Sequence, residues 1–174
     1  MSRPTIRPTN VERFFAEDDV IVSKTDLKGI ITYANKIFLD IADYTEKEVV
    51  GQPHNIIRHP EMPAGIFRLM WDTIQDSREI FAYVCNMTKG GDHYWVLAHV
   101  TPTFNEKGVP IGYHSNRRVP ERRVMPGIQE LYARLRAEER RHASPREGAT
   151  ASLAIINRML ADKGVSYDEY IHGL

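Results

Sequence analysis

A short block in the first half of the chain gathers side chains that could bind an anionic group. His54, Arg58 and His59 all lie between Pro53 and Pro60. The planar guanidinium of an arginine forms paired hydrogen bonds with a phosphate, and imidazoles add further donors. Such a block is usually a solvated loop when it stands alone. Its chemistry therefore depends on whether the fold turns these side chains toward one cavity.

Other reactive chemistry is weakly represented. The remaining histidines show no recognised metal-binding spacing with His54 and His59; they are His93, His99, His114, His142 and His172. Cys85 is the only cysteine, so neither an internal disulfide nor a thiolate cluster can form, as is typical of a reducing compartment. No nucleophile and base pair or carboxylate dyad stands out, and we expect no enzyme.

The charge balance gives no partner. Lys and Arg number 23, as do Asp and Glu, so no net field favours nucleic acid or anionic lipid. Four arginines follow one another closely, but beside acidic helices they are more typical of a solvated face than of a nucleic-acid site; they are Arg117, Arg118, Arg122 and Arg123. No apolar run is long enough to cross a bilayer, and a cytoplasmic location is expected.

Alternation of apolar and polar residues predicts five strands. Residues 19–33 contain two β-branched runs on either side of a turn in which Asp26 can bond the backbone and Gly29 can take a positive φ. Period-two segments follow at residues 80–86, 93–103 and 109–116, separated by glycine-containing turns. The five segments predict an antiparallel sheet.

Helical periodicity fills the interval between the second and third strands. Residues 35–43 carry an apolar stripe, and the segment from Thr45 to Glu48 has a capping-box pattern that Gly51 would close. A longer amphipathic helix starts at Pro63; its apolar side chains are Ile66, Phe67, Met70, Trp71 and Ile74. These segments predict an α+β fold, with short helices on one face of the sheet.

The last third of the chain is helical in pattern. A charged helix follows Pro120, residues 142–148 look like a linker, and a second amphipathic helix contains Leu153 and Ile156 and stops at Gly164. We therefore divide the chain into an N-terminal cap segment (1–17), a sensor domain (18–119), a flanking helix (120–143), and a linker with an amphipathic helical tail (144–174).

Three stretches with this element order resemble a known family. They are Ile31 to Asn35, Gly51 to Pro60 and Gly91 to Val96, and together they are similar to the PAS sensor domain of bacterial aerotaxis receptors. The resemblance covers about residues 18 to 135, and the block from Gly51 to Pro60 is its most specific part. The expected fold is the five-stranded antiparallel PAS sheet with helices on one face, followed by C-terminal helices.

The resemblance implies a noncovalently bound FAD. The positions that match the family's cofactor-linked residues are Asn35, His54, Arg58, His59, Trp71, Asn86 and Tyr94. Each also has a purely structural interpretation, since Asn35 alone suits a helix N-cap, and Trp71 and Tyr94 suit the core. Where the family favours Asp, this chain has Glu61, which keeps the charge and adds one methylene.

A second likeness argues against photochemistry. The stretch from Asn86 to Gly91 resembles the flavin-binding strand of LOV photosensors, in which the asparagine faces the pyrimidine edge of the flavin. Those photosensors need a cysteine in the block that corresponds to Gly51 to Arg58, where this chain has His54 at the aligned place. A light-driven cysteinyl adduct is therefore not expected.

The function that the resemblance implies is a redox or oxygen sensor. Aerotaxis receptors continue into membrane anchors and a signalling coiled coil; this chain shows neither, which predicts a stand-alone module that signals through its C-terminal helices to a partner protein or as a homodimer. The apolar residues of the tail would dock that partner or pack back on the sheet. Two alternatives are a PAS domain that binds haem, with His59 as axial ligand, or another small ligand, and a cofactor-free dimerisation module.

Overall fold

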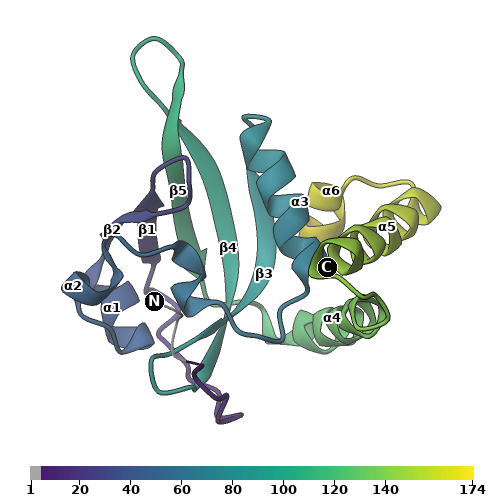
Figure 1. Ribbon diagram of the computed structural model, residues 1–174, viewed down its shortest axis with the longest axis horizontal. Coiled ribbons are helices and arrows are strands. Elements are labelled where there is room, and N and C mark those ends of the chain that lie inside the picture. Colours follow the sequence, from purple (N-terminus) through teal and green to yellow (C-terminus); the bar gives the residue numbers. More distant parts are fainter. Residues whose placement is uncertain (1–4) are drawn as a thin grey trace.

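The computed structural model describes residues 5–174 and contains one five-stranded antiparallel sheet (Figure 1). The strands are β1 (Ile21–Thr25), β2 (Ile31–Ala34), β3 (Ile80–Met87), β4 (His93–Phe104) and β5 (Pro110–Arg118). Their order in the sheet is β2-β1-β5-β4-β3, so the chain's first two strands join its last strand and β2 and β3 form the edges. The predicted α+β class and sheet are confirmed.

The turn between β1 and β2 forms for the reason that the sequence suggested. The Asp26 carboxylate accepts hydrogen bonds from the backbone nitrogens of Lys28 at 2.8 Å and Ile30 at 2.9 Å. Gly29 has a φ of +79°, which a residue with a Cβ rarely adopts. This turn brings the backbone of Gly29 close to the helices that follow.

Four short elements cover one face of the sheet between β2 and β3. They are α1 (Lys36–Ala42), α2 (Glu46–Val49), the 3₁₀ helix η1 (His54–Ile57) and α3 (Ala64–Gln75). The capping box of α2 forms between Thr45 and Glu48, as predicted. The fully buried residues beneath these elements include Ile21, Ile31, Phe38 and Ile66, so burial of their apolar faces positions η1 and α3 over the sheet.

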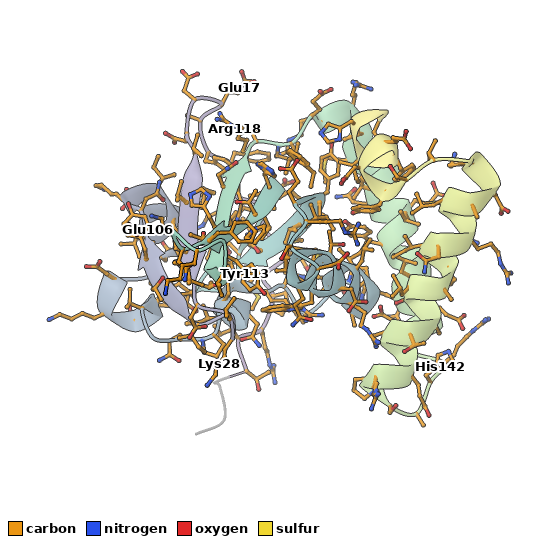
Figure 2. The ribbon with its side chains drawn as sticks, turned by 90° about the horizontal axis from the view of Figure 1, so that it is seen from above. Glu17, Lys28, Glu106, Tyr113, Arg118 and His142 are labelled. Atoms are coloured by element: carbon orange, nitrogen blue, oxygen red, sulfur yellow. The ribbon has the colours of Figure 1, made fainter. Side chains whose placement is uncertain are left out.

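The C-terminal helices lie beyond the β3 edge and reach the opposite face of the sheet (Figures 1 and 2). They are η2 (Arg122–Val124), α4 (Met125–Glu139), α5 (Pro145–Lys163) and α6 (Tyr167–His172). The Tyr132 hydroxyl of α4 donates to the carbonyl oxygen of Tyr83 on β3 at 2.6 Å. Helix α5 begins at Pro145 with Ser144 as its N-cap, so the predicted linker is shorter than residues 142–148.

Helix α5 packs against α3, which places the tail next to the pocket-side helices. The backbone of Leu153 is so close to Gly65 that a Cβ on Gly65 would lie 2.9 Å from the Leu153 nitrogen. One carboxylate oxygen of Glu139 accepts from the Gly65 nitrogen at 3.0 Å and from the Ser152 hydroxyl at 2.6 Å. A buried apolar set from α5 and α6 joins the main core; it comprises Ile156, Leu160 and Ile171.

Residues 9–13 run beside the turn between β3 and β4. Arg13 donates from its backbone nitrogen to the His93 carbonyl oxygen at 2.7 Å, and its side chain pairs with Asp92 at 2.9 Å. Within residues 5–174, no helix combines the length and the apolar character that a bilayer crossing requires.

Candidate functional site

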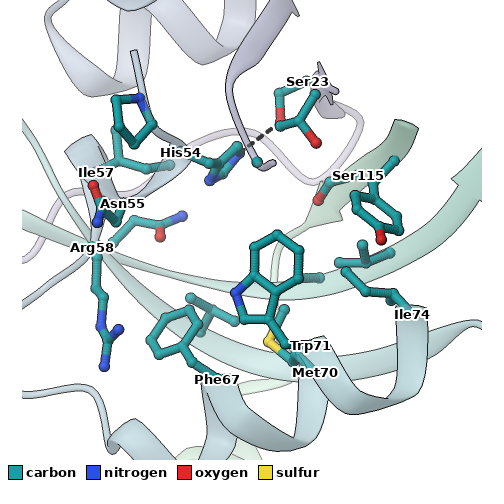
Figure 3. A pocket seen from close by; sticks show the side chains of 18 of the residues that line it. Ser23, His54, Asn55, Ile57, Arg58, Phe67, Met70, Trp71, Ile74 and Ser115 are labelled. Atoms are coloured by element: carbon teal, nitrogen blue, oxygen red, sulfur yellow. Dashed lines mark hydrogen bonds between the residues drawn. The ribbon is translucent and has the colours of Figure 1, made fainter. Parts of the chain in front are cut away.

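A cavity of about 240 Å³ opens between the sheet and the helices on its first face (Figure 3). Inward-facing side chains of β1, β3, β4 and β5 form one side, and the β1–β2 turn, η1 and α3 form the other. The apolar lining residues include Ile57, Phe67, Met70, Trp71, Val84, Ala98 and Val100. Pockets that enclose a drug-sized ligand usually measure roughly 300–1,000 Å³, so this cavity suits a planar ring system and not a whole dinucleotide.

The polar lining of the cavity carries positive charge without any negative charge. Three cationic side chains line it, namely Lys28, Arg58 and Arg117, together with the imidazole of His54. The cavity-lining residues of the described chain include no Asp and no Glu. Lys28 is exposed, Arg58 is partly exposed and Arg117 is buried, so cations lie both at the rim and at the enclosed end. Such a site favours an anionic ligand.

Arg58 is held at the rim of the cavity by the edge of the sheet. It follows η1 directly and forms an antiparallel bridge with Asn86 of β3. Its guanidinium carbon lies 3.9 Å from the centre of the Phe67 ring, and the side chain runs along the edge of the cavity (Figure 3). Burial lowers the pKa of Arg58, while the carboxylate of Glu139 acts in the opposite direction. The planar donor fork therefore stays cationic at the cavity mouth.

Asn86 contributes a buried amide to the cavity wall. The residue is 4% exposed, and its Nδ2 forms no hydrogen bond of good geometry among the described residues, although the Tyr94 phenol lies beside it. Because buried polar groups nearly always have a partner, an unpaired amide in a cavity wall indicates a group that bonds to a ligand. The polar edge of a heterocyclic ring would satisfy it.

The aromatic wall is formed by Trp71 of α3 and Tyr113 of β5. Their ring centres lie 5.7 Å apart and the rings are nearly perpendicular, at 86°. A Cβ on Gly29 would lie 3.1 Å from the Trp71 ring, so the glycine lets the indole approach the β1–β2 turn. Trp71 is thus a packing residue and a cavity-lining residue at once, and the two interpretations from the sequence are compatible.

Sequence reasoning missed several residues of the cavity lining, among them Lys28, Tyr113 and Arg117, and Arg117 is the most deeply buried of these three. Its assignment to a solvated face was wrong, because Arg117 is 2% exposed and lines the cavity. Its Nε donates to the Ser115 hydroxyl at 3.1 Å, and its Nη2 contacts the Ser23 hydroxyl and lies 2.9 Å from His54 Nε2. Period-two alternation from Tyr113 places Arg117 on the cavity face, and that pattern could have identified it.

His54 acts as an acceptor in this group. Its Nε2 lies 2.8 Å from the Ser23 hydroxyl (Figure 3) and faces the Arg117 guanidinium, which can only donate. Burial and the charge of Arg117 lower the pKa of His54 to about 3. The imidazole is therefore neutral with Nε2 unprotonated. At this atom it cannot donate to a ligand, contrary to the donor role that the sequence suggested.

Three of the seven predicted residues do not line this cavity. Asn35 is the N-cap of α1, where its Oδ1 accepts from the Phe38 nitrogen at 3.0 Å and its Nδ2 donates to the Val20 carbonyl oxygen at 2.8 Å. Tyr94 is fully buried beside Asn86, and burial raises the pKa of its phenol. His59 lies on another surface. The structure brings together His54, Arg58, Trp71 and Asn86.

A second cavity of about 270 Å³ lies between α4 and the opposite face of the sheet. Its lining includes His59, Glu61, Cys85, His93, Trp95, Tyr132 and Arg136. Burial and the neighbouring His93 lower the pKa of His59, and Glu61 pairs with Arg136 of α4 at 3.1 Å. Burial also raises the pKa of the Cys85 thiol. Within residues 5–174, no group of three or more His, Cys, Asp or Glu side chains could hold a metal ion.

The segment that forms most of the sheet and its covering helices matches the sequence model of a known family. A family model described as the PAS fold matches residues 31–117. The chain belongs to the PAS-fold family. In this PAS chain the matched span runs from β2 to the end of β5 and contains η1, α3 and β3, which carry most of the cavity lining.

Two curated relatives of this PAS chain are an aerotaxis receptor and a phototropin. The aerotaxis receptor of Escherichia coli (strain K12) is 38% identical over 136 residues, which is 78% of this chain and 26% of the receptor. Phototropin-2 of Oryza sativa subsp. japonica is 31% identical over 78 residues, or 45% of this chain and 9% of the phototropin. The PAS chain therefore spans about a quarter or less of these relatives, and the similarity is to one part of each.

Solved structures support the PAS fold at low sequence identity. The dark structure of the blue-light photoreceptor Aureochrome1 LOV has a TM-score of 0.56 at 20% identity and covers 66% of this chain and 86% of its own. The light-state dimer of the fungal blue-light photoreceptor Vivid has a TM-score of 0.53 at 21% identity, with coverages of 66% and 85%. These similarities concern the fold alone.

Proposed function

We propose that the chain binds FAD noncovalently in the first cavity and reports redox state or oxygen to a partner. The observation that carries the proposal is the charge of the cavity, which has cations at the rim and at the enclosed end and no carboxylate in its lining. The 38% identity to an aerotaxis receptor supports the same assignment. The chain would act as a sensor and not as an enzyme.

The cavity residues suit the parts of FAD. A dinucleotide carries its negative charge on the pyrophosphate, and Lys28 and Arg58 are the cations at the rim. The isoalloxazine ring needs apolar or aromatic faces and donors for its polar edge, which Trp71, Tyr113 and the unpaired amide of Asn86 offer. At about 240 Å³ the cavity would enclose the ring and leave the adenosine outside.

The bound flavin would supply reversible electron uptake. The residues of the chain would then convert a change at the cavity wall into a change at the C-terminal helices. Asn86 lies on β3, three residues after Tyr83, and the Tyr83 carbonyl oxygen accepts a hydrogen bond from the Tyr132 hydroxyl of α4. Glu139 of α4 influences the pKa of Arg58 and caps the start of α3. Both connections lead from the cavity to α4.

The output would pass from α4 and α5 to a signalling protein or a second copy of the chain. The apolar residues of the tail pack mainly against α3 and α4, and α6 reaches β3, whereas the sequence had suggested packing on the sheet or docking of a partner. A partner would therefore contact the polar outer surface of these helices. The haem alternative gains no support from the cavity, because His59 lines the other one.

An absorption spectrum of the freshly purified protein tests the proposal. We expect two flavin bands that bleach with dithionite and return in air. A haem Soret band would contradict the proposal, and so would a colourless protein that does not bind added FAD.

A second experiment tests whether Arg58 binds the phosphates of FAD. We expect Arg58→Ala to weaken FAD binding at least tenfold and to leave riboflavin, which has no phosphate, nearly unaffected, because a charge-assisted hydrogen bond to phosphate contributes about 1.5–3 kcal/mol. Arg68→Ala is the matched control, since Arg68 lies on α3 outside the cavity lining and pairs with Asp72. Equal loss of FAD and riboflavin binding would refute the phosphate role of Arg58.

A further inference from the structure

Arg117 is a buried cation without a counter-charge. Its hydrogen-bond partners are the hydroxyls of Ser115 and Ser23 and the neutral imidazole of His54, and the buried phenol of Tyr94, whose pKa is raised, lies nearby. None of the ion pairs in residues 5–174 includes it, and its Nη1 has no hydrogen-bond partner there. Burial lowers the pKa of Arg117 to about 10, so the group stays protonated at neutral pH.

A guanidinium in such surroundings is costly to the fold. Removal of a charge from water is compensated only when an opposite charge or a full set of acceptors replaces the solvent. The contacts of Arg117 satisfy Nε and Nη2 but leave Nη1, and its ring neighbour Phe38, at 5.4 Å from the guanidinium carbon, adds only a weak cation–π attraction. The missing interaction is one that a ligand in the cavity can provide.

Arg117 is separate from the cations that suit a phosphate. Lys28 lies on the β1–β2 turn and Arg58 at the rim, whereas Arg117 projects from β5 at the enclosed end beside Ser115 and His54. A ligand that occupies the cavity would therefore meet positive charge at two ends. At the enclosed end, Arg117 would be stabilised by negative charge on the ring system of the ligand.

We propose that Arg117 is a ligand-binding residue that provides the counter-charge for negative charge on the ring of the bound ligand. This inference rests on the proposed function, in which the ring is a flavin. An electron that enters the ring from a reductant without a proton leaves one negative charge on it, and a nearby fixed cation stabilises that charge. Arg117 thus lets the ring accept electrons with fewer protons than a neutral site would.

The dependence of the midpoint potential on pH tests the proposal. One proton per electron changes the potential by about 59 mV for each tenfold change in proton concentration. We expect the wild-type protein, reduced with dithionite in the presence of redox dyes, to show a clearly smaller slope. Arg117→Gln, which keeps a donor and loses the charge, should steepen the slope toward that value, and Arg117→Lys should retain the wild-type slope.

The same variants show the relative affinity of the two redox states. In Arg117→Gln we expect reduced flavin to lose about tenfold in affinity relative to oxidised flavin, which is about 59 mV for a one-electron couple and about 30 mV for a two-electron couple. Arg118→Gln is the matched control, because Arg118 is the next residue of β5 but is exposed and lies at the periphery (Figure 2). A purely structural Arg117 would change stability and leave slope and potential as they are, which would overturn the proposal.

Two further outcomes are decisive. If Arg117→Gln does not fold, the wild-type slope decides alone, and uptake of one proton per electron overturns the proposal. If the wild-type protein binds no flavin, the proposed function fails separately, and thermal shifts with sodium acetate and sodium phosphate test Arg117 instead. Saturable stabilisation that Arg117→Lys keeps and Arg117→Gln loses would then support an anion at this residue. A response that Arg117→Gln keeps, or no saturable response in the wild type, would overturn it.

Discussion

Gly65→Ala should loosen the C-terminal helices from α3. The two helices cross at Gly65, where an added Cβ would lie 2.9 Å from the Leu153 nitrogen and 3.1 Å from the Ser152 Cβ. Neither backbone nor Cβ can rotate away, so the helices must separate. Separation would also lengthen the hydrogen bonds that Glu139 accepts from Gly65 and Ser152.

The expected cost follows from these contacts. Overpacking of a closely packed site costs about 1–3 kcal/mol, and the weakened hydrogen bonds to a charged acceptor add about 1–2 kcal/mol. Alanine offsets this by about 1 kcal/mol through its higher helix propensity. We expect a net loss of about 1–4 kcal/mol in the free energy of unfolding. For a chain of 174 residues this corresponds to a decrease of several degrees in Tm.

Gly127→Ala is the control for this prediction. Gly127 is also helical, but no atom lies within 4 Å of its added Cβ. The same substitution should therefore raise the free energy of unfolding by up to about 1 kcal/mol. Urea unfolding followed by circular dichroism measures both, and amide exchange should show faster exchange of α5 in Gly65→Ala alone. Equal or greater stability of Gly65→Ala would refute the close α3–α5 crossing.

Two further predictions concern the cavity. The folded state lowers the pKa of His54 from 6.5 to about 3, so the unfolded state binds the proton first as the pH falls. The free energy of unfolding therefore keeps its full contribution from His54 above pH 6.5. It decreases by up to about 1.4 kcal/mol per pH unit as the pH falls toward 3. Urea titrations should show a weaker loss in His54→Gln, and parallel curves would refute the assignment. Gly29→Ala should lower the free energy of unfolding by about 1–2 kcal/mol because of its positive φ, and should also lower flavin occupancy because the new Cβ meets the Trp71 ring. Gly108→Ala is the control, since it has a φ of +73° but no atom within 4 Å, and it should cost only the backbone strain. Equal flavin occupancy in the two glycine variants would contradict the contact with Trp71.

The fold was predictable because local signals agreed with the packing. The turn with Asp26 and Gly29, the capping box at Thr45 and the period-two strands each encode their own conformation. The linker was predicted too long, because Ser144 and Pro145 form an N-cap and first turn that the loop-like composition of residues 142–148 concealed. The position of the tail also escaped prediction, since docking on α3 depends on the absence of a side chain at Gly65.

The site was predictable only in part. His54, Arg58, Trp71 and Asn86 line one cavity, as their joint prediction requires. The sequence cannot show that consecutive residues diverge, and His59 faces the other side of the sheet although it follows Arg58 directly. Arg117 escaped notice because four neighbouring arginines look solvated until strand alternation assigns each to a face.

The bridge between Arg58 and Asn86 also covers part of the edge of the sheet. Strand β3 is an edge, and an unpaired edge can recruit an extended segment of another molecule and start aggregation. The backbone of Arg58 and His59 occupies part of this edge, with the His59 nitrogen bonded to the Cys85 carbonyl oxygen at 3.4 Å. A ligand that binds the Arg58 side chain would therefore also keep this edge of β3 covered. Loss of such a ligand would leave the edge more exposed and the chain more prone to self-association.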